Sequence, residues 1–306
     1  MTTVTVLAGG VGGARAARGF DSVLPPEALT IIVNVGDDDR IHGVHVSADI
    51  DTVLYTLADR EGPEGWGLAD DTFTVMERLA AEGQDTTFRL GDIDLALCLA
   101  RTRALDEGEP LSSIVARIAT ILGVARRIIP VTDGALRTRI ETTTGAWLGF
   151  QEYFVYRRQR DEVASIEYTG AGLSVPAPGV LEAIGAADLV VIAPSNPPLS
   201  VWPILAVPGV RDAVAAARRV LAISPLFAGV ALKGPAHRVM ASLGLPPGTA
   251  GVLAAYRGLL TDLVIDTGDA ADVARLAGEV AIHATDTRIA RRDDAARLAS
   301  FIMGLT

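Results

Sequence analysis

The sequence of 306 residues contains one cysteine and one lysine. Because Cys98 has no second cysteine to pair with, an intramolecular disulfide is excluded, and so is a zinc site built from cysteines. Apolar residues flank Cys98 on both sides, so we expect a buried structural thiol. Lys233 is the only lysine beside many arginines, and alanine and glycine are abundant. This bias is typical of a GC-rich genome, and we assign no role to Lys233.

Long apolar runs and a secretory leader are also lacking. No segment is apolar over the roughly 20 residues that a membrane-spanning helix needs, and the first residues lack the basic region and cleavage site of a signal peptide. Hydrophobic residues make up 49% of the chain and charged residues 21%, which is typical of soluble globular proteins. The formal net charge of −10 argues against nonspecific binding to nucleic acid. We therefore expect a cytoplasmic protein that binds neither nucleic acid nor membranes.

The motifs of several catalytic classes are absent. The sequence has no Gly-x-Ser-x-Gly nucleophile elbow and no motif that would partner Cys98. The four histidines show neither an HExxH motif nor another metal-ligand spacing. Catalysis through a serine or cysteine nucleophile is therefore not supported. The histidines are His42, His45, His237 and His283.

Short apolar runs alternate with helical patterns along most of the chain. Buried parallel strands form continuous apolar runs, and strands that alternate with helices predict a doubly wound, mostly parallel sheet of the Rossmann-like α/β class. Ser47 is expected to cap a helix with an apolar stripe. The expected strands are residues 4–8, 29–35, 187–193, 219–223, 263–266 and 280–284. The expected helices are residues 14–20, 48–57, 111–122, 210–218, 271–278 and 288–303.

The middle of the chain differs from this pattern. Residues 127–168 include stretches with β-type alternation, such as 138–142 and 150–154. We therefore predict a mostly antiparallel, β-rich insertion or subdomain over residues 125–170. It would lie within a single α/β domain that spans residues 1–306.

Four glycines stand together after the first expected strand, in the run Gly-Gly-Val-Gly-Gly at residues 9–13. A strand, a glycine-rich turn and a helix place backbone N–H groups at a helix N-terminus, which attracts phosphate. The dinucleotide fingerprint would need a third glycine where Arg15 stands, and a Walker A loop would need Gly-Lys-Ser/Thr, so neither standard pattern fits. A turn that only allows close packing is the alternative, but Arg15 and Arg18 favour phosphate binding.

Aspartates gather shortly after this turn. Residues 37–39 are three aspartates at the end of the second expected strand, where open α/β sheets bind ligands. Asp49 and Asp51 begin the next helix, where they would point roughly 200° apart. They could share one site only if Asp49 lies before or within the first turn. Carboxylates brought together from two loops suit a divalent cation such as Mg²⁺. Helix capping or solvation is the alternative for each of them.

Two other positions carry side chains suited to ligand binding. Arg89 precedes a candidate turn at residues 91–94 and could contact a phosphate or a planar ligand. Chemistry alone favours the alternative, a surface arginine. Trp66 stands between two glycines and is either a stacking platform or part of a plain hydrophobic loop.

Several stretches, in one order along almost the whole chain, resemble the 2-phospho-L-lactate transferase family, which builds the deazaflavin coenzyme F-420. The sequence is most similar to the actinobacterial members, which are phosphoenolpyruvate transferases. The matching stretches are residues 7–13, 33–38, 49–55, 66–67, 71–73, 89–92, 194–197 and 224–235.

This resemblance implies an Mg²⁺-dependent transfer. The donor would be a three-carbon acid activated by guanosine diphosphate, the acceptor the ribityl hydroxyl of 7,8-didemethyl-8-hydroxy-5-deazariboflavin, and the leaving group GMP. Asp51, which would orient the hydroxyl and accept its proton, is expected to contact the deazaflavin with Arg89 and Trp66. Family members can carry lysine at the position of Arg89. The expected nucleotide-binding residues are Gly9, Gly10, Gly12, Gly13, Ser195, Asn196 and Pro197, and the metal candidates are Asp37, Asp38 and Asp49.

Two other functions compete with this one. A non-catalytic, nucleotide-sugar-binding regulatory protein can share the fold and the glycine turn. A dinucleotide-dependent dehydrogenase is disfavoured by the missing third glycine, although Asp37 comes close to the acidic position that would bind a ribose. The sequence leaves open whether the donor is enolpyruvyl, lactyl or glyceryl, although similarity to actinobacterial members favours enolpyruvyl. A homodimer is the expectation from the family.

Overall fold

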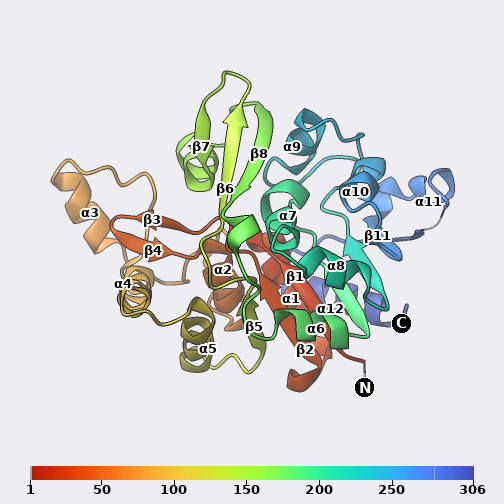
Figure 1. The fold of residues 1–306 in the computed structure, drawn as a ribbon, viewed down its shortest axis with the longest axis horizontal. Helices are drawn as coiled ribbons and strands as arrows, with labels where there is room; N and C mark the ends of the chain where they lie inside the picture. The colour runs from red at the N-terminus through yellow and green to blue at the C-terminus, as the bar shows by residue number, and fades with distance from the viewer. Residues whose placement is uncertain (1, 279) are drawn as a thin grey trace.

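The computed structural model describes residues 2–278 and 280–306, and a seven-stranded parallel sheet forms its centre (Figure 1). The strand order is β12-β11-β10-β9-β1-β2-β5, and all neighbouring strands run parallel. This confirms the predicted Rossmann-like α/β class. The strands are β1 (Val4–Ala8), β2 (Leu29–Val33), β5 (Arg127–Pro130), β9 (Leu189–Ile192), β10 (Val220–Ile223), β11 (Asp262–Asp266) and β12 (Ala281–Thr285).

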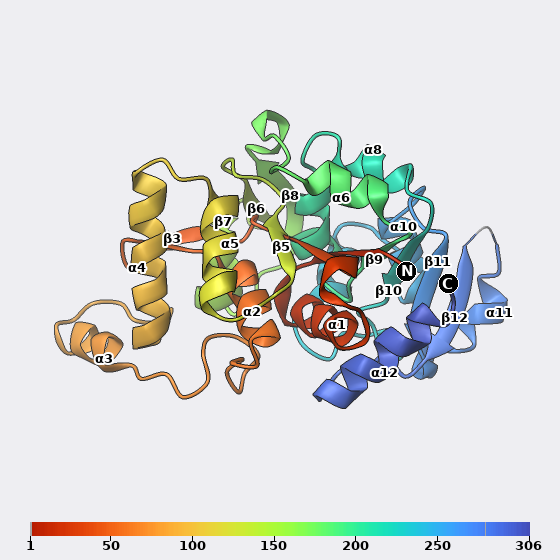
Figure 2. The ribbon, with the colours of Figure 1, turned by 90° about the horizontal axis from the view of Figure 1, so that it is seen from below.

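Helices cover both faces of this sheet, so the central strands are buried throughout. On one face α1 packs against α12, and on the other α6 packs against α8 (Figure 2). The helices are α1 (Gly10–Val23), α2 (Ala48–Leu57), α3 (Thr74–Ala81), α4 (Asp92–Asp106), α5 (Leu111–Ile121), α6 (Val180–Ala186), α7 (Trp202–Leu205), α8 (Val210–Ala215), α9 (Ala236–Ser242), α10 (Thr249–Ala255), α11 (Asp272–Arg275) and α12 (Arg292–Met303). Among the described residues, no helix combines the length and the apolarity that crossing a membrane requires.

A hairpin and two helices form a lobe beside the central sheet (Figure 1). The hairpin strands are β3 (Asp39–Ile41) and β4 (Val44–Val46), and α3 and α4 enclose a separate apolar cluster with them. Cys98, on α4, is fully buried in that cluster, which confirms the expectation of a structural thiol. The expected turn at residues 91–94 is instead the beginning of α4.

A three-stranded antiparallel sheet stands above the central sheet, as the alternation predicted. Its strands are β6 (Arg137–Thr142), β7 (Trp147–Gly149) and β8 (Val163–Thr169), in the order β7-β6-β8. Two parts of the expectation were wrong. Strand β5, which lies within residues 125–170, pairs with β2 at the edge of the central sheet. Residues 152–156 form a helical turn, where strand-like alternation had been expected over residues 150–154, and the rings of Phe150 and Phe154 stack beside it with centroids 5.4 Å apart.

The contact between α1 and α12 requires a glycine. A Cβ atom added to Gly19 of α1 would lie 2.4 Å from the carbonyl oxygen of Ala295 on α12. We expect Gly19→Ala to lower the free energy of unfolding by about 1–3 kcal/mol, because the helices must move apart. The matched control is Gly185→Ala on α6, where nothing lies within 4 Å of the added atom. It should raise that free energy by about 0.5 kcal/mol. Urea denaturation measures both, and equal effects would contradict the prediction.

Candidate functional site

Three loops meet where the direction of strand order reverses. The chain runs outward from β1 through β2 to β5, and later outward from β9 to β12 on the other side of β1. The loops that follow β1, β2 and β9 therefore lie at the carboxyl edge of adjacent strands, which is the ligand-binding position of open α/β sheets. The side chain of Asn34 after β2 and that of Ser195 after β9 both reach this point.

The glycine-rich segment is the beginning of a helix, not a loop before it. We expected the helix at residue 14, but α1 starts at Gly10, which has a φ of +64°. A Cβ atom at Gly12 would lie 2.7 Å from the carbonyl oxygen of Pro194, and one at Gly13 would lie 2.8 Å from the hydroxyl of Ser195. Close packing therefore accounts for much of the glycine content.

The N-terminus of α1 nevertheless keeps unused hydrogen-bond donors. The N–H of Gly9 donates to Ser195 Oγ (3.3 Å), and that of Gly10 donates to Asp49 Oδ1 (2.6 Å). Among the described residues, the N–H groups of Val11 and Gly12 have no acceptor. Free N–H groups at a helix N-terminus can bind an anion. The site can thus still accept a phosphate beside the carboxylate of Asp49.

Asp37 and Asp49 form a buried carboxylate pair next to this helix end. Asn34 bridges them, because its amide nitrogen donates to Asp49 Oδ2 (2.9 Å) and Asp37 Oδ1 (3.3 Å). The backbone N–H of Asp49 also donates to Asp37 Oδ2 (3.0 Å). Burial, then repulsion from Asp49 and Asp38, raises the pKa of Asp37 well above its usual value, and burial raises the pKa of Asp49 to about 6. A bound cation would favour the ionised form of both carboxyls and so lower their pKa values again.

Asp38 belongs to a different hydrogen-bond group. Its Oδ2 accepts hydrogen bonds from the hydroxyl of Ser47 (2.9 Å) and the ring of His45 (2.9 Å). Ser47 stands at the N-cap position of α2, as expected, but its hydroxyl bonds to Asp38 instead of capping the helix. The three metal candidates therefore differ in their partners, because Asp37 and Asp49 are bridged by Asn34 while Asp38 Oδ2 faces His45. The other oxygen of Asp38, Oδ1, is buried without a partner among the described residues.

Asp51 points away from Asp49, towards the interior of the lobe. The two nitrogens at the end of the Arg101 guanidinium bind both carboxylate oxygens of Asp51, and Arg101 is completely buried. Burial raises the pKa of Asp51, and attraction to Arg101 lowers it. The helical spacing thus separates the two aspartates as the angle suggested. Arg101 could not be found from the sequence, because no local pattern marks an arginine as buried.

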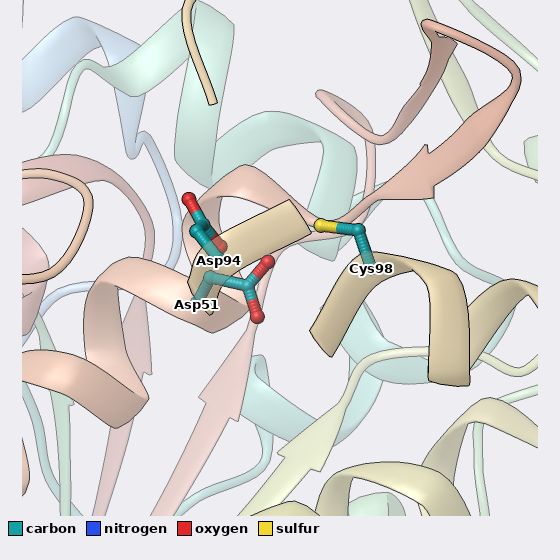
Figure 3. Close-up of side chains that lie close together, drawn as sticks. All are labelled: Asp51, Asp94 and Cys98. Atoms are coloured by element: carbon teal, nitrogen blue, oxygen red, sulfur yellow. The ribbon is translucent and has the colours of Figure 1, made fainter. Parts of the chain in front are cut away.

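Asp51, Asp94 and Cys98 have ligand atoms within 4.8 Å of one another (Figure 3). Arg101 already satisfies Asp51, and the hydroxyl of Tyr55 donates to Asp94 Oδ1 (2.7 Å). Burial raises the pKa of the Cys98 thiol and raises that of Asp94 to about 7. The protonated thiol is a poor metal ligand, and the Arg101 guanidinium beside it repels a cation. The cluster is therefore a hydrogen-bonded part of the core and does not fit a metal.

Arg89 is presented by two helices that cap each other. The carboxylate of Asp71 accepts the N–H groups of Ile93 and Asp94 at the start of α4, while the carboxylate of Asp92 accepts those of Thr74 and Val75 at the start of α3. Gly91 is required because a Cβ atom there would lie 2.1 Å from Asp71 Oδ2. Capping thus explains most of the motif at residues 89–92. The exposed guanidinium of Arg89 lies 4.3 Å from the ring centre of Phe73.

The antiparallel sheet supports the loop that carries Asp37. The backbone N–H of Thr138 on β6 donates to the carbonyl of Gly36 (2.7 Å), and the buried amide of Gln151 donates to the carbonyl of Asp37 (2.8 Å). Sequence reasoning missed both residues, because their partners lie more than 100 positions away. The insertion therefore fixes the carboxylate pair from above.

The loop after β9 faces the glycine segment. The hydroxyl of Ser195 donates to the carbonyl of Gly9 (2.7 Å), and Pro197 begins the buried helical turn that follows. Asn196 Oδ1 accepts the N–H of Leu199 (3.3 Å), while Asn196 Nδ2 is buried without a partner in the described part of the chain. A buried amide donor that lacks an acceptor can serve a ligand. Of the remaining candidates, Trp66 is 54% exposed, on a loop packed against α1.

Comparisons with known proteins support one family. A family model described as 2-phospho-L-lactate transferase CofD matches residues 4–297. A phosphoenolpyruvate transferase of Streptomyces griseus is 42% identical over 88% of this chain and 87% of its own. A 2-phospho-L-lactate transferase of Methanocaldococcus jannaschii is 36% identical over 98% of this chain and 97% of its own. A solved protein of the UPF0052 family from Bacillus halodurans has a TM-score of 0.67 at 18% identity, covering 99% of this chain and 98% of its own, which shows likeness of fold.

The raised pKa of Asp94 predicts a pH effect on stability. The folded state favours the protonated carboxyl, so its stabilising contribution is complete below about pH 4 and is lost as the pH rises through about 7. Asp94→Asn cannot ionise and keeps an acceptor for Tyr55. We expect its free energy of unfolding to equal that of the parent at pH 4 and to exceed it by roughly 3 kcal/mol at pH 8. Denaturant titrations at a series of pH values measure this difference.

Asp92→Asn provides a comparison of opposite sign. Hydrogen bonds from Thr72 and from the backbone of Val75 lower the pKa of Asp92, so its contribution is present above the usual pKa and is lost as the pH falls. This variant should be the less stable protein at neutral pH, with a gap that closes in acid. Parallel pH profiles for Asp94→Asn and the parent would contradict the assignment.

Proposed function

We propose a function for this chain from its family, because it belongs to the 2-phospho-L-lactate transferase CofD family. We infer that it is a transferase of coenzyme F-420 biosynthesis. It would move a phosphoenolpyruvyl group, or a 2-phospholactyl group, from a guanosine diphosphate-activated donor to 7,8-didemethyl-8-hydroxy-5-deazariboflavin, with release of GMP. The names of the bacterial relatives support the enolpyruvyl donor. The resemblance also supports a homodimer that acts in the cytoplasm.

The carboxylate pair at the N-terminus of α1 carries this proposal. The unpartnered N–H groups of Val11 and Gly12 suit the phosphates of the donor, and the buried donor of Asn196 suits a further acceptor atom of the nucleotide. The carboxylates of Asp37 and Asp49 repel an anion in the same place. A ligand set that includes a cation removes this conflict while both carboxylates stay ionised, and a metal-bound diphosphate is such a set.

The residues present fit Mg²⁺. Asp37 and Asp49 offer hard oxygen atoms, and Asn34 and Gln151 hold the pair in position. Their raised pKa values are the signature of buried carboxylates that lack a positive partner. When bound, Mg²⁺ would neutralise charge on the phosphates and leave the protein to supply orientation. Asp38 would support the site indirectly, through its charge and its bond to Ser47.

We place the acceptor on the side of the lobe. Trp66 and Arg89 are exposed and offer an aromatic ring and a planar cation to the deazaflavin. The family resemblance supports Asp51 as a further contact of the acceptor, although its side chain is buried against Arg101. Each of its carboxylate oxygens keeps a second lone pair for a hydroxyl. Arg101 binds both oxygens of Asp51 and so fixes the direction of its carboxylate, which suits Asp51 to orient the ribityl hydroxyl. A loose phosphoryl-type transition state needs little help from a base.

Product analysis tests the function directly. The purified protein is offered the deazaflavin, Mg²⁺ and one activated donor at a time, with the enolpyruvyl, lactyl and glyceryl donors in separate reactions. We expect mass spectrometry to detect the acceptor with an added phosphodiester, and GMP in equal amount, most rapidly with the enolpyruvyl donor. Nucleotide binding without any transfer would sink the proposal and support the non-catalytic alternative.

Variants of the carboxylates test the metal site. We expect Asp37→Asn and Asp49→Asn each to lower kcat/KM by about 10²-fold or more, because the charge that holds the cation is halved. The half-saturating Mg²⁺ concentration should rise in both. Asp39→Asn is the control, since Asp39 belongs to the same run but its carboxylate accepts the N–H of Arg40. Asp51→Asn should also reduce turnover, and unchanged turnover would exclude an orienting role for Asp51.

A further inference from the structure

Glu61 ties the loop that carries Trp66 to the helix that begins with the glycine segment. Its carboxylate accepts hydrogen bonds from Arg15 Nε (2.9 Å), Arg18 Nη1 (3.2 Å) and the hydroxyl of Thr56 (3.3 Å). The Glu61 side chain is 10% exposed, and those of the two arginines are 20% and 12% exposed. Partly buried ion pairs are screened less by solvent than surface pairs. The contact is therefore a firm attachment between the loop and α1.

This arrangement changes the role expected for the two arginines. The sequence favoured Arg15 and Arg18 as phosphate ligands, but both face Glu61. The group of two guanidinium ions and one carboxylate carries one net positive charge, and Arg18 Nε is buried without a partner in the described residues. The two arginines therefore bind the loop directly through Glu61. A phosphate at the helix end would be attracted only by the net positive charge of the three-residue group.

The loop also touches the first turn of α1. A Cβ atom at Gly65 would lie 2.7 Å from Val11 Cγ1 and 3.4 Å from Arg15 Nη2, and Gly65 has a φ of +95°. Val11 is one of the two residues whose N–H groups are free for the donor phosphates. The residue before Trp66 therefore packs on the very turn to which we assign the nucleotide.

Internal hydrogen bonds make the loop a compact unit with an exposed tip. The N–H of Gly62 donates to the carbonyl of Gly67 (2.9 Å), that of Gly65 donates to Gly62 (3.0 Å), and Glu61 forms a β-bridge with Leu68. Leu68 is buried, whereas Trp66 is 54% exposed. A loop closed by these hydrogen bonds directs the Trp66 ring outward from a fixed backbone. The ring is suited to stack on a planar aromatic ligand.

We propose that Glu61 is a positioning residue that couples the two substrate sites. Glu61 holds the Trp66 loop on α1. A nucleotide bound at the first turn of α1 would therefore strengthen the stacking of the aromatic acceptor on Trp66. The acceptor would strengthen nucleotide binding by the same factor. Binding of either ligand would order the contact between Gly65 and Val11, at a cost in conformational entropy. The second ligand then binds more tightly, because the first has already met that cost. This inference rests on the proposed function.

Direct binding measures the coupling without any turnover. The deazaflavin is fluorescent, so anisotropy gives its Kd with and without saturating GDP and Mg²⁺. For the parent protein we expect GDP to lower that Kd by about fivefold or more, a coupling within the usual range for linked sites. A ratio of one would overturn the inference while the transfer assay leaves the proposed function standing. Failure to bind deazaflavin at all would overturn both.

Two glycine variants separate the contact from backbone strain. Gly65→Ala introduces a clash with Val11 at a positive φ, whereas Gly67→Ala has a φ of +65° but nothing within 4 Å of its added atom. We expect Gly65→Ala to reduce the GDP effect on the deazaflavin Kd to less than twofold. Gly67→Ala should keep at least half of the parent ratio. The same loss in both variants would show that loop strain, not the contact with α1, sets the ratio, and would overturn the inference.

Variants of Glu61 test the ion pairs. Glu61→Leu should raise KM for the deazaflavin by about tenfold while kcat falls less than threefold, because the loop is released but the carboxylate pair at Asp37 and Asp49 is untouched. Glu61→Gln keeps an acceptor for Arg15 and should recover part of the loss. Circular dichroism checks that each variant folds, and where Glu61→Leu does not fold, Gly65→Ala decides. An equal fall in kcat and in kcat/KM, with KM unchanged, would count against a positioning role.

Discussion

The site is arranged around two carboxylates that are held, buried, at the positive end of a helix. Asp37 and Asp49 lie where the N-terminus of α1 and the ends of β1 and β2 meet, and Asn34 fixes their spacing. The helix end offers N–H groups to an anion, while the carboxylates repel one. The neighbourhood can therefore hold phosphate and metal together more readily than either alone. Most other features of the site hold these carboxylates in place beside the helix end.

The supports of this pair come from distant parts of the chain. The loop after β9 contacts the glycine segment through Ser195, and the segment that follows β7 reaches the loop of Asp37 through Gln151. The sheet that looked like an appendage in the sequence thus has a structural task at the site.

The sequence predicted the central sheet well and the site contacts only in part. Apolar runs such as residues 4–8 and 189–192 are local signals of buried strands, so their type and approximate ends could be predicted. The glycines and aspartates were found because they cluster along the chain. Arg101 and Glu61 were not, since a charged residue on a helix or loop looks exposed until its distant partner is known. The helical turn at residues 152–156 was missed, because the five residues 150–154 alternate as in a strand and are too few to separate the helical period from the strand period.

The reciprocal caps between α3 and α4 have a consequence for how the lobe opens. Asp92, the first residue of α4, holds the first turn of α3, and Asp71, in the segment just before α3, holds the first turn of α4. If this junction comes apart, both helices lose N-terminal hydrogen bonds. The two helices then form one cooperative unit of local unfolding, whose amide protons exchange with solvent together. Arg89, which stands between the caps and lies on Phe73, leaves its place in the same event. If Arg89 binds a planar ligand as proposed, the affinity for that ligand would depend partly on the free energy of opening that helix pair.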